Sequence, residues 1–161
     1  MGPVAGAREV AERFYERFGE GDMIAAFADF APDCVAFTPS GRLDNERHIA
    51  AARSLKSAMP DGRMQLIRVR EWGEEVYVTG WFRGTHLHEL NTPLGAIPAS
   101  GKSLEMYFTD YFRVAGGRIV ECEAVWDRLG MVAQLGTGIA ADVGHLPAAL
   151  LARGPGFGTR G

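Results

Sequence analysis

The first half of the chain shows the hydrophobic spacing of helices. Apolar residues recur every three or four positions between Val4 and Phe18, and Gly19 follows as a stop signal. Asp22 and Asp44 each precede a further helical stretch, at the position where a carboxylate caps the first turn. The pattern therefore predicts three helices, over residues 4–18, 23–30 and 44–58.

The second half changes to the alternating pattern of strands. Apolar and polar residues alternate along four stretches, and Gly116-Gly117 separates the last two as a hairpin turn. A short apolar segment at 34–37 indicates a buried strand fragment, and a loop with proline and glycine is expected over 91–101. The predicted strands cover 64–70, 75–88, 102–115 and 118–126, and a short helix follows over 127–135.

Helices followed by a run of antiparallel strands indicate an α+β domain. One curved, mixed or antiparallel sheet would wrap around the N-terminal helices and leave a deep apolar cavity, where a small ligand could bind. The length of 161 residues suits a single domain, which we expect over 1–136. Residues 137–161 are rich in Gly, Ala and Pro, and we expect them to form a partly mobile tail.

The composition argues against several classes of partner. The 17 basic and 20 acidic residues give a formal net charge of -3, which offers no electrostatic surface for nucleic acid or an anionic membrane. The two cysteines, Cys34 and Cys122, are far apart, so we expect no disulfide framework and a cytoplasmic location. No stretch approaches the roughly 20 apolar residues of a membrane span, and the first residues lack the apolar core of a secretory signal.

Asp110 is the one charged residue between Met106 and Val114 on the apolar face of the strand predicted over 102–115. Alternation places it on the same face as Phe108 and Phe112. A buried carboxyl group either has a raised pKa or needs a dedicated partner. Two interpretations stay open: a structural carboxylate bound to a backbone amide or an arginine, and a functional group that faces the cavity.

His86 falls on the apolar side of the preceding predicted strand, which we expect to neighbour the strand of Asp110. An imidazole in this position could donate a hydrogen bond to a substrate carbonyl or orient a carboxylate. The alternative is a histidine whose hydrogen bonds are satisfied within the core. His88 lies on the same face but nearer to the following loop.

Asp127 follows Trp126 at the junction between the last predicted strand and the last predicted helix. It can act as a helix N-cap, because an apolar helical run follows directly behind it. It could also place a carboxylate at the mouth of the cavity, beside an indole that excludes water. The spacing alone favours the N-cap interpretation, and capping would lower the basicity of the carboxylate by stabilising the anion.

Two segments near the end of the predicted domain resemble a known family. The stretch 117–121 (Gly-Arg-Ile-Val-Glu) and the stretch 125–136, which begins Val-Trp-Asp-Arg-Leu-Gly, are similar to the C-terminal signature of SnoaL-like polyketide cyclases. Earlier segments fit the same family in the expected order, at 14–16, 21–22, 31–33, 84–86, 101–102 and 111–113. The resemblance covers residues 8–136 and implies membership of the NTF2-like superfamily.

The resemblance implies an enzyme that closes a ring in an aromatic polyketide ester by an intramolecular aldol reaction, without metal or organic cofactor. The acid/base aspartate of the family falls on Asp127, which reverses the preference from spacing, and a pocket histidine falls approximately on His86. His86 or a protonated Asp110 would polarise the carbonyl under attack. Flat apolar walls would hold the small aromatic substrate, and the candidate wall residues are Phe14, Tyr15, Phe82, Phe108 and Trp126.

Two other functions stay open on the same scaffold. A water-using enzyme, such as an epoxide hydrolase or a polyketide hydroxylase, would need Asp110 and Asp127 bridged by an arginine. The candidate bridges are Arg42, Arg47 and Arg68. A non-catalytic binding module would use the cavity only to hold a small ligand, and there Asp110 and His86 would bond each other or the backbone.

A metal-binding cupin is a further alternative. His86 and His88 partly match the first cupin motif, in which two histidines on a strand bind a metal. Glu89 comes too early for the carboxylate of that motif, and the helical first half argues against a cupin barrel.

Three aromatic residues are predicted to point outward from the sheet, namely Tyr77, Trp81 and Tyr111. Exposed aromatic residues in a row usually mark an interface. We therefore expect a homodimer or homotetramer that assembles through this sheet face.

Overall fold

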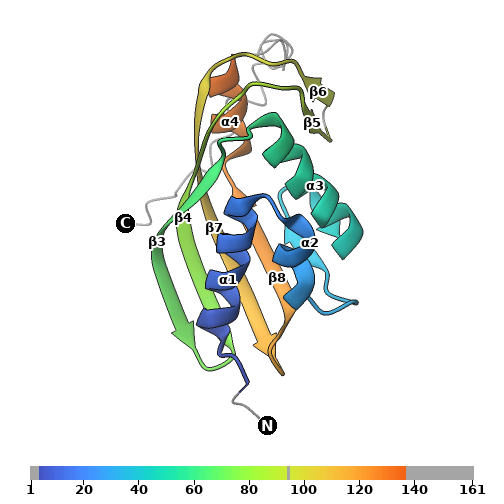
Figure 1. The fold of residues 1–161 in the computed structure, drawn as a ribbon, viewed down its shortest axis with the longest axis vertical. Helices are drawn as coiled ribbons and strands as arrows, with labels where there is room; N and C mark the ends of the chain where they lie inside the picture. Colours follow the sequence, from blue (N-terminus) through green and yellow to red (C-terminus); the bar gives the residue numbers. More distant parts are fainter. Residues whose placement is uncertain (1–3, 94, 137–161) are drawn as a thin grey trace, which may run out of the picture.

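A curved six-stranded sheet forms the body of the protein, and helices cover one of its faces (Figure 1). The computed structural model describes residues 4–93 and 95–136. The strands of this sheet are β1 (Ala36–Thr38), β2 (Gly41–Leu43), β3 (Arg63–Trp72), β4 (Glu75–Thr85), β7 (Ser103–Ala115) and β8 (Arg118–Trp126). Their order is β2-β1-β8-β7-β4-β3, with β1 parallel to β8 and the other neighbours antiparallel. The predicted α+β class with a curved mixed sheet is confirmed.

The helices are α1 (Ala7–Glu20), α2 (Met23–Ala26), the 3-10 turn η1 (Phe27–Asp29), α3 (Asn45–Ala58) and α4 (Arg128–Leu135). Helices α2, α3 and α4 begin directly after a capping aspartate, whereas α1 begins after Gly6 without a side-chain cap. The Asp22 and Asp44 carboxylates accept hydrogen bonds from backbone N–H groups in the first turns of α2 and α3, at 3.0 and 2.9 Å. Helix α1 buries residues spaced by three and four, among them Phe14 and Phe18, against the sheet.

Three short strands were not predicted from the pattern. Strand β2 follows a tight turn, and the hairpin of β5 (Leu90–Thr92) and β6 (Gly95–Ile97) occupies the segment expected to be a loop. Strand β4 also ends at Thr85, three residues earlier than expected. A strand of three residues is too short to show a readable alternation of apolar and polar positions. The predicted tail over 137–161 lies outside the described residues.

Alternation along β7 separates a buried face from an exposed one. Met106, Phe108, Asp110 and Phe112 are buried, whereas the residues between them are half-buried or exposed. Asp110 lies directly opposite Val78 on β4. The core therefore fills the space between the inner face of the sheet and the helices, and Asp110 lies within it, as the alternation predicts.

Gly80 on β4 makes room for an aromatic side chain of the inner face. A Cβ atom at this position would lie 2.8 Å from the Phe108 ring and would also clash with the backbone oxygen of Gln65. A larger residue would therefore displace Phe108 or separate β3 from β4. The missing side chain at Gly80 therefore leaves the space that the Phe108 ring occupies.

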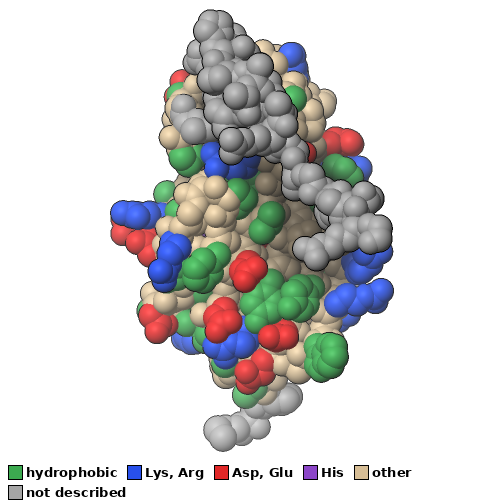
Figure 2. Space-filling model, turned by 180° about the vertical axis from the view of Figure 1, so that it is seen from behind, with side chains coloured by type: hydrophobic (Ala, Val, Ile, Leu, Met, Phe, Trp, Pro, Cys, Tyr) green, Lys and Arg blue, Asp and Glu red, His purple; other side chains and the backbone are tan. Residues whose placement is uncertain are grey.

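The outer face of the sheet carries aromatic side chains among charged ones, and Figure 2 shows hydrophobic and acidic side chains interspersed on this side of the molecule. Tyr77 packs on Tyr111 with ring centroids 5.0 Å apart, and Trp81 packs on Tyr107 at 5.1 Å. Tyr77 is 48% exposed and Tyr107 is 40% exposed. The predicted outward direction of this aromatic row is correct, while assembly through it stays a prediction.

Candidate active site

A cavity of about 320 Å³ lies between the helices and the inner face of the sheet. Its volume falls within the range of pockets that hold small ligands. Most of its wall is apolar, and the elements that contribute are α1, η1, α3 and α4 together with strands from both sheets. The apolar lining residues include Phe14, Phe18, Phe27, Leu43, Leu55, Met64, Phe82, Met106, Phe108, Trp126 and Met131.

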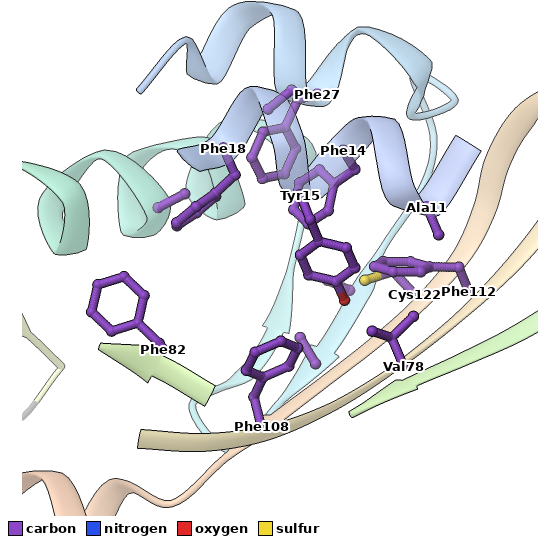
Figure 3. Packing of buried hydrophobic residues seen from close by; sticks show 14 of the residues in the cluster. Ala11, Phe14, Tyr15, Phe18, Phe27, Val78, Phe82, Phe108, Phe112 and Cys122 are labelled. Atoms are coloured by element: carbon purple, nitrogen blue, oxygen red, sulfur yellow. The ribbon is translucent and has the colours of Figure 1, made fainter. Parts of the chain in front are cut away.

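Aromatic rings from two layers face each other across this interior (Figure 3). Phe14, Phe18 and Phe27 come from the helical layer, whereas Phe82 and Phe108 project from β4 and β7. Four of the five predicted wall residues line the cavity, namely Phe14, Phe82, Phe108 and Trp126. The fifth, Tyr15, is buried behind the wall rather than in it.

Asp110 is the carboxyl group of the cavity wall. It is 7% exposed, and its Oδ2 accepts a hydrogen bond from the Tyr15 hydroxyl at 2.5 Å. Burial raises the pKa of Asp110 to about 7, although the hydrogen bonds from Tyr15 and from the Val125 backbone act in the opposite direction. Desolvation is the larger effect, so this carboxyl group exchanges its proton near neutral pH.

Tyr15 is buried and donates the hydrogen bond that orients the Asp110 carboxyl group. Its ring lies 5.7 Å from the ring of Phe108 and 5.0 Å from that of Phe14, centroid to centroid, so packing fixes its orientation. Burial, together with the negative charge of Asp110, raises the pKa of the Tyr15 hydroxyl well above its ordinary value. The hydroxyl therefore keeps its proton and acts only as a donor to the carboxyl group.

His48 lines the cavity as well, although it was not among the predicted site residues. Its ring packs edge-on against Phe27 with centroids 4.8 Å apart, and its Nδ1 is buried without a hydrogen-bond partner among the described residues. Burial lowers the pKa of His48 to about 4, so the imidazole is neutral at physiological pH. Its spacing of four and seven residues from the apolar Ala52 and Leu55 of α3, which pack in the core, was the available signal.

Asp127 does not line the cavity, although its neighbours Trp126 and Arg128 do. The side chain is exposed and caps α4, where its Oδ1 accepts a hydrogen bond from the Gly130 N–H at 2.8 Å. Alternation at the end of β8 turns Trp126 inward and the next residue outward. The expectation that Asp127 faces the cavity is therefore corrected, and its position fits the N-cap interpretation.

His86 is buried but lies apart from Asp110. Strand β4 ends one residue before it, and its Nδ1 lies 2.9 Å from the Ser100 hydroxyl oxygen. The register pairs Thr85 with Ser103, seven residues before Asp110 along β7. His86 is not among the described residues that line the cavity, so the structure does not bring these two predicted site residues together. Burial lowers the pKa of His86.

The positions of Asp110 and Asp127 also bear on the water-using enzyme that was left open as an alternative to a cyclase. A water-using site that needs Asp110 and Asp127 on either side of an arginine loses its basis, because one carboxylate faces the cavity and the other faces solvent. Within residues 4–93 and 95–136, no group of three or more His, Cys, Asp or Glu side chains is arranged to hold a metal ion. The helices of that same part of the chain are each too short or too polar to cross a membrane.

The chain belongs to the family of SnoaL-like domains, whose model matches residues 11–122. Its fold is that of the NTF2-like superfamily, as the resemblance implied. No curated protein matches the sequence.

Solved structures of other proteins share this fold. IdmH, a candidate polyketide cyclase from Streptomyces antibioticus, is 26% identical with a TM-score of 0.70, and the alignment covers 83% of this chain and 100% of IdmH. A candidate polyketide cyclase from Acidithiobacillus ferrooxidans is 24% identical with a TM-score of 0.68, covering 84% and 98% of the two chains. AclR, a candidate hydroxylase from Streptomyces galilaeus, is 15% identical with a TM-score of 0.72, covering 83% and 98%.

Proposed function

We propose that this protein is a polyketide cyclase that closes a ring by an aldol-type reaction, with Asp110 as acid and base. The observation that carries the proposal is a carboxyl group inside a largely apolar cavity, with its pKa raised to about 7. Such a group is about half ionised near neutral pH, so it can both take and return a proton. The substrate that we propose is an aromatic polyketide or its ester.

The proposed reaction moves one proton and forms one bond. The Asp110 carboxylate removes a proton from a substrate carbon that lies between two carbonyl groups. The resulting enolate carbon attacks a ketone of the same molecule, so that a carbon–carbon bond forms and the ketone oxygen becomes an alkoxide. Protonated Asp110 then returns the proton to this oxygen. Atoms and charges balance within the molecule, and the product is an isomer of the substrate.

Two neighbouring side chains are assigned supporting roles in this proposal. Tyr15 is a positioning residue, because its hydroxyl holds one oxygen of the Asp110 carboxyl group. His48 lines the same cavity as a neutral imidazole, which could donate an N–H to the oxygen that gains charge. These roles replace those that the resemblance implied for Asp127 and His86.

The aromatic walls support a flat substrate. Phe14, Phe82, Phe108 and Trp126 offer ring faces and edges from different elements, so a folded polyketide chain would be held between them. A chain held in this way has its reacting carbons close together before the bond forms. Two structural neighbours with this fold are named as candidate polyketide cyclases, which agrees with the proposal.

The test is ring closure of an aromatic polyketide that carries a β-dicarbonyl side chain, followed by chromatography of a product of unchanged mass. We expect Asp110→Asn to lower the turnover by about 10²- to 10⁴-fold, the usual contribution of general acid–base catalysis. Asp127→Asn is the matched control, because asparagine also caps helices well, and it should retain turnover. Equal turnover of Asp110→Asn and wild type would contradict the role of Asp110, and ring closure no faster than the uncatalysed reaction in both would favour a binding module.

The oligomeric state and the cellular location are separate proposals. We propose a homodimer or homotetramer that buries the outer aromatic row, including Tyr77 and Tyr111, and a cytoplasmic location. The molar mass in solution, measured by light scattering for wild type and for Tyr77→Lys, tests the assembly. A monomeric wild type would contradict it.

A further inference from the structure

The fixed charges on the cavity wall are positive, although the chain as a whole carries a formal charge of -3. Among the described lining residues, Arg47 and Arg128 carry guanidinium groups, which are cationic side chains. Asp110 is the carboxyl group of the wall, and it is largely protonated below pH 7. The cavity therefore combines apolar walls with two guanidinium groups.

We infer that the cavity takes a flat apolar ligand that carries a free carboxylate, and that Arg47 and Arg128 bind this carboxylate. The inference rests on the proposed function and deepens it, since it names the unesterified polyketide acid as the substrate class. It also assigns an orientation to the substrate, with its anionic end at the two arginines and its reacting carbonyl groups at Asp110.

Arg128 is held at one corner of the cavity. As the first residue of α4, it follows the N-cap, and its Nη1 donates to the Pro39 backbone oxygen at 2.9 Å. This bond ties α4 to the turn between β1 and β2, and Ser40 in that turn lines the cavity. A guanidinium group has five N–H donors, so one backbone contact leaves the others available to a ligand.

Arg47 reaches the cavity from the first turn of α3, which follows directly after β2. Its nearest acidic partner is Asp44, with Nε and Oδ2 4.0 Å apart, and both side chains are exposed, at 74% and 59%. An exposed pair at this distance contributes little. The Arg47 guanidinium can therefore turn to an anionic ligand at small cost. Both arginines line the cavity, and the segment from Pro39 to Arg47 connects the residue that Arg128 contacts with the start of α3.

The chemistry favours a carboxylate over an ester at this place. Two parallel N–H bonds from a planar guanidinium match the two oxygens of a carboxylate, and these bonds are stronger than those between neutral groups. An ester carries no charge and has only one carbonyl oxygen to accept. Arg128 is half-buried, so water competes less for its guanidinium than for that of the exposed Arg47.

The test uses two competitors of nearly equal shape, the neutral 2-naphthamide and the anionic 2-naphthoate. N-phenyl-1-naphthylamine serves as a neutral fluorescent reporter, and its own affinity checks the cavity of each variant. Full-length protein is titrated at about pH 6, where Asp110 is mainly neutral and does not repel the acid. We expect wild type to prefer the acid at least about tenfold, which corresponds to one charge-assisted contact.

The double variant Arg47→Gln/Arg128→Gln should lose this preference while its affinity for the reporter and the amide stays unchanged. The matched control is Arg42→Gln/Arg53→Gln, which removes the same charge from exposed arginines of β2 and α3 that are not among the lining residues. The control should keep the preference. Arg47→Lys/Arg128→Lys should restore part of it, because the charge returns without the planar fork.

Three results would overturn the inference. The first is a wild type that binds acid and amide equally, or does not bind 2-naphthoate at all. The second is a control variant that loses the preference as fully as the cavity variant, since a general surface charge would then explain it. The third is an equal loss of acid, amide and reporter in the cavity variant. This binding test is independent of the ring-closure test described above. If wild type shows no preference for the acid while ring closure depends on Asp110, this inference is rejected and the proposed function stands.

Discussion

Two aspartates of this chain show how the environment decides what a carboxyl group can do. Asp110 lies in the middle of β7, faces an apolar cavity, and has its pKa raised to about 7. Asp127 lies at the end of β8, faces solvent, and accepts a hydrogen bond from the first turn of α4. The first group is placed to exchange protons with a ligand, and the second stabilises a helix end.

The comparison also separates two kinds of inference. Resemblance to a family signature favoured Asp127, because the signature carries its aspartate at that position. Physical reasoning about alternation identified Asp110, because a single charge on an apolar face needs an explanation. The structure places Asp110 in the cavity wall and Asp127 outside it. A motif identifies a segment, whereas the direction of each side chain depends on where the strand ends.

The largest expected effect on stability concerns Asp110→Asn. The folded-state pKa of about 7 exceeds the unfolded value of about 3.9, so folding favours the protonated form. The stabilisation of the folded state by protonated Asp110 is complete below about pH 4 and is lost as the pH rises through about 7. Asparagine stays neutral at every pH. The free energy of unfolding of the variant should therefore exceed that of wild type at about pH 8, by at most on the order of 4 kcal/mol, and the difference should be smaller at about pH 5.

Urea unfolding of both proteins at the two pH values measures this difference, and Asp127→Asn serves as the control. The control should follow the pH dependence of wild type. If Asp110→Asn also follows it, the carboxyl group of Asp110 is not buried as described.

A smaller effect is expected for Tyr15→Phe, which removes the hydroxyl that donates to Asp110. That hydrogen bond lowers the pKa of Asp110, so its loss should raise the pKa further. The rising limb of kcat/KM against pH should then move to higher pH, with turnover at pH 7 reduced by about tenfold. Tyr77→Phe, on the outer face, should leave the profile in place. An unchanged profile for Tyr15→Phe would separate Tyr15 from the acid/base group.

The smallest effect is expected for Asp127→Ala. Loss of the N-cap of α4 should lower the free energy of unfolding by about 1 kcal/mol, while Asp127→Asn retains most of it. Turnover at saturating substrate should stay within about twofold of wild type, because the side chain does not reach the cavity. Thermal unfolding and kinetics of the two variants provide the measurement. A large loss of turnover in both, with folding intact, would return the acid/base role to Asp127.

Most of the fold was predictable because its longer elements carry clear periodicity. Helix α3 has the predicted cap and the predicted last residue, and β8 has the predicted ends. Strand β2 and the β5–β6 hairpin were missed because segments of three residues show no period, and their pairing depends on distant neighbours. The class, the curvature and the cavity followed from the longer elements.

The site was predictable only in part. Alternation placed Phe108 and Asp110 on the inner face, and the structure agrees. Arg128 and His48 were not identified as site residues, since their approach to the cavity depends on how α3 and α4 pack against the sheet. His86 continues the alternation of β4, but the strand ends one residue before it. Its imidazole contacts the Ser100 hydroxyl instead of the cavity. The type of a side chain and the periodicity of the sequence do not show how helices pack or at which residue a strand ends.

The central claim is that the cavity raises the pKa of Asp110 so that it exchanges a proton near neutral pH. Carbon-13 NMR of the side-chain carboxyl groups, recorded across the pH range and assigned with Asp110→Asn, measures this value directly. The structure predicts a titration midpoint of about 7 for Asp110. A midpoint near 4, the ordinary value for an exposed aspartate, would contradict the account.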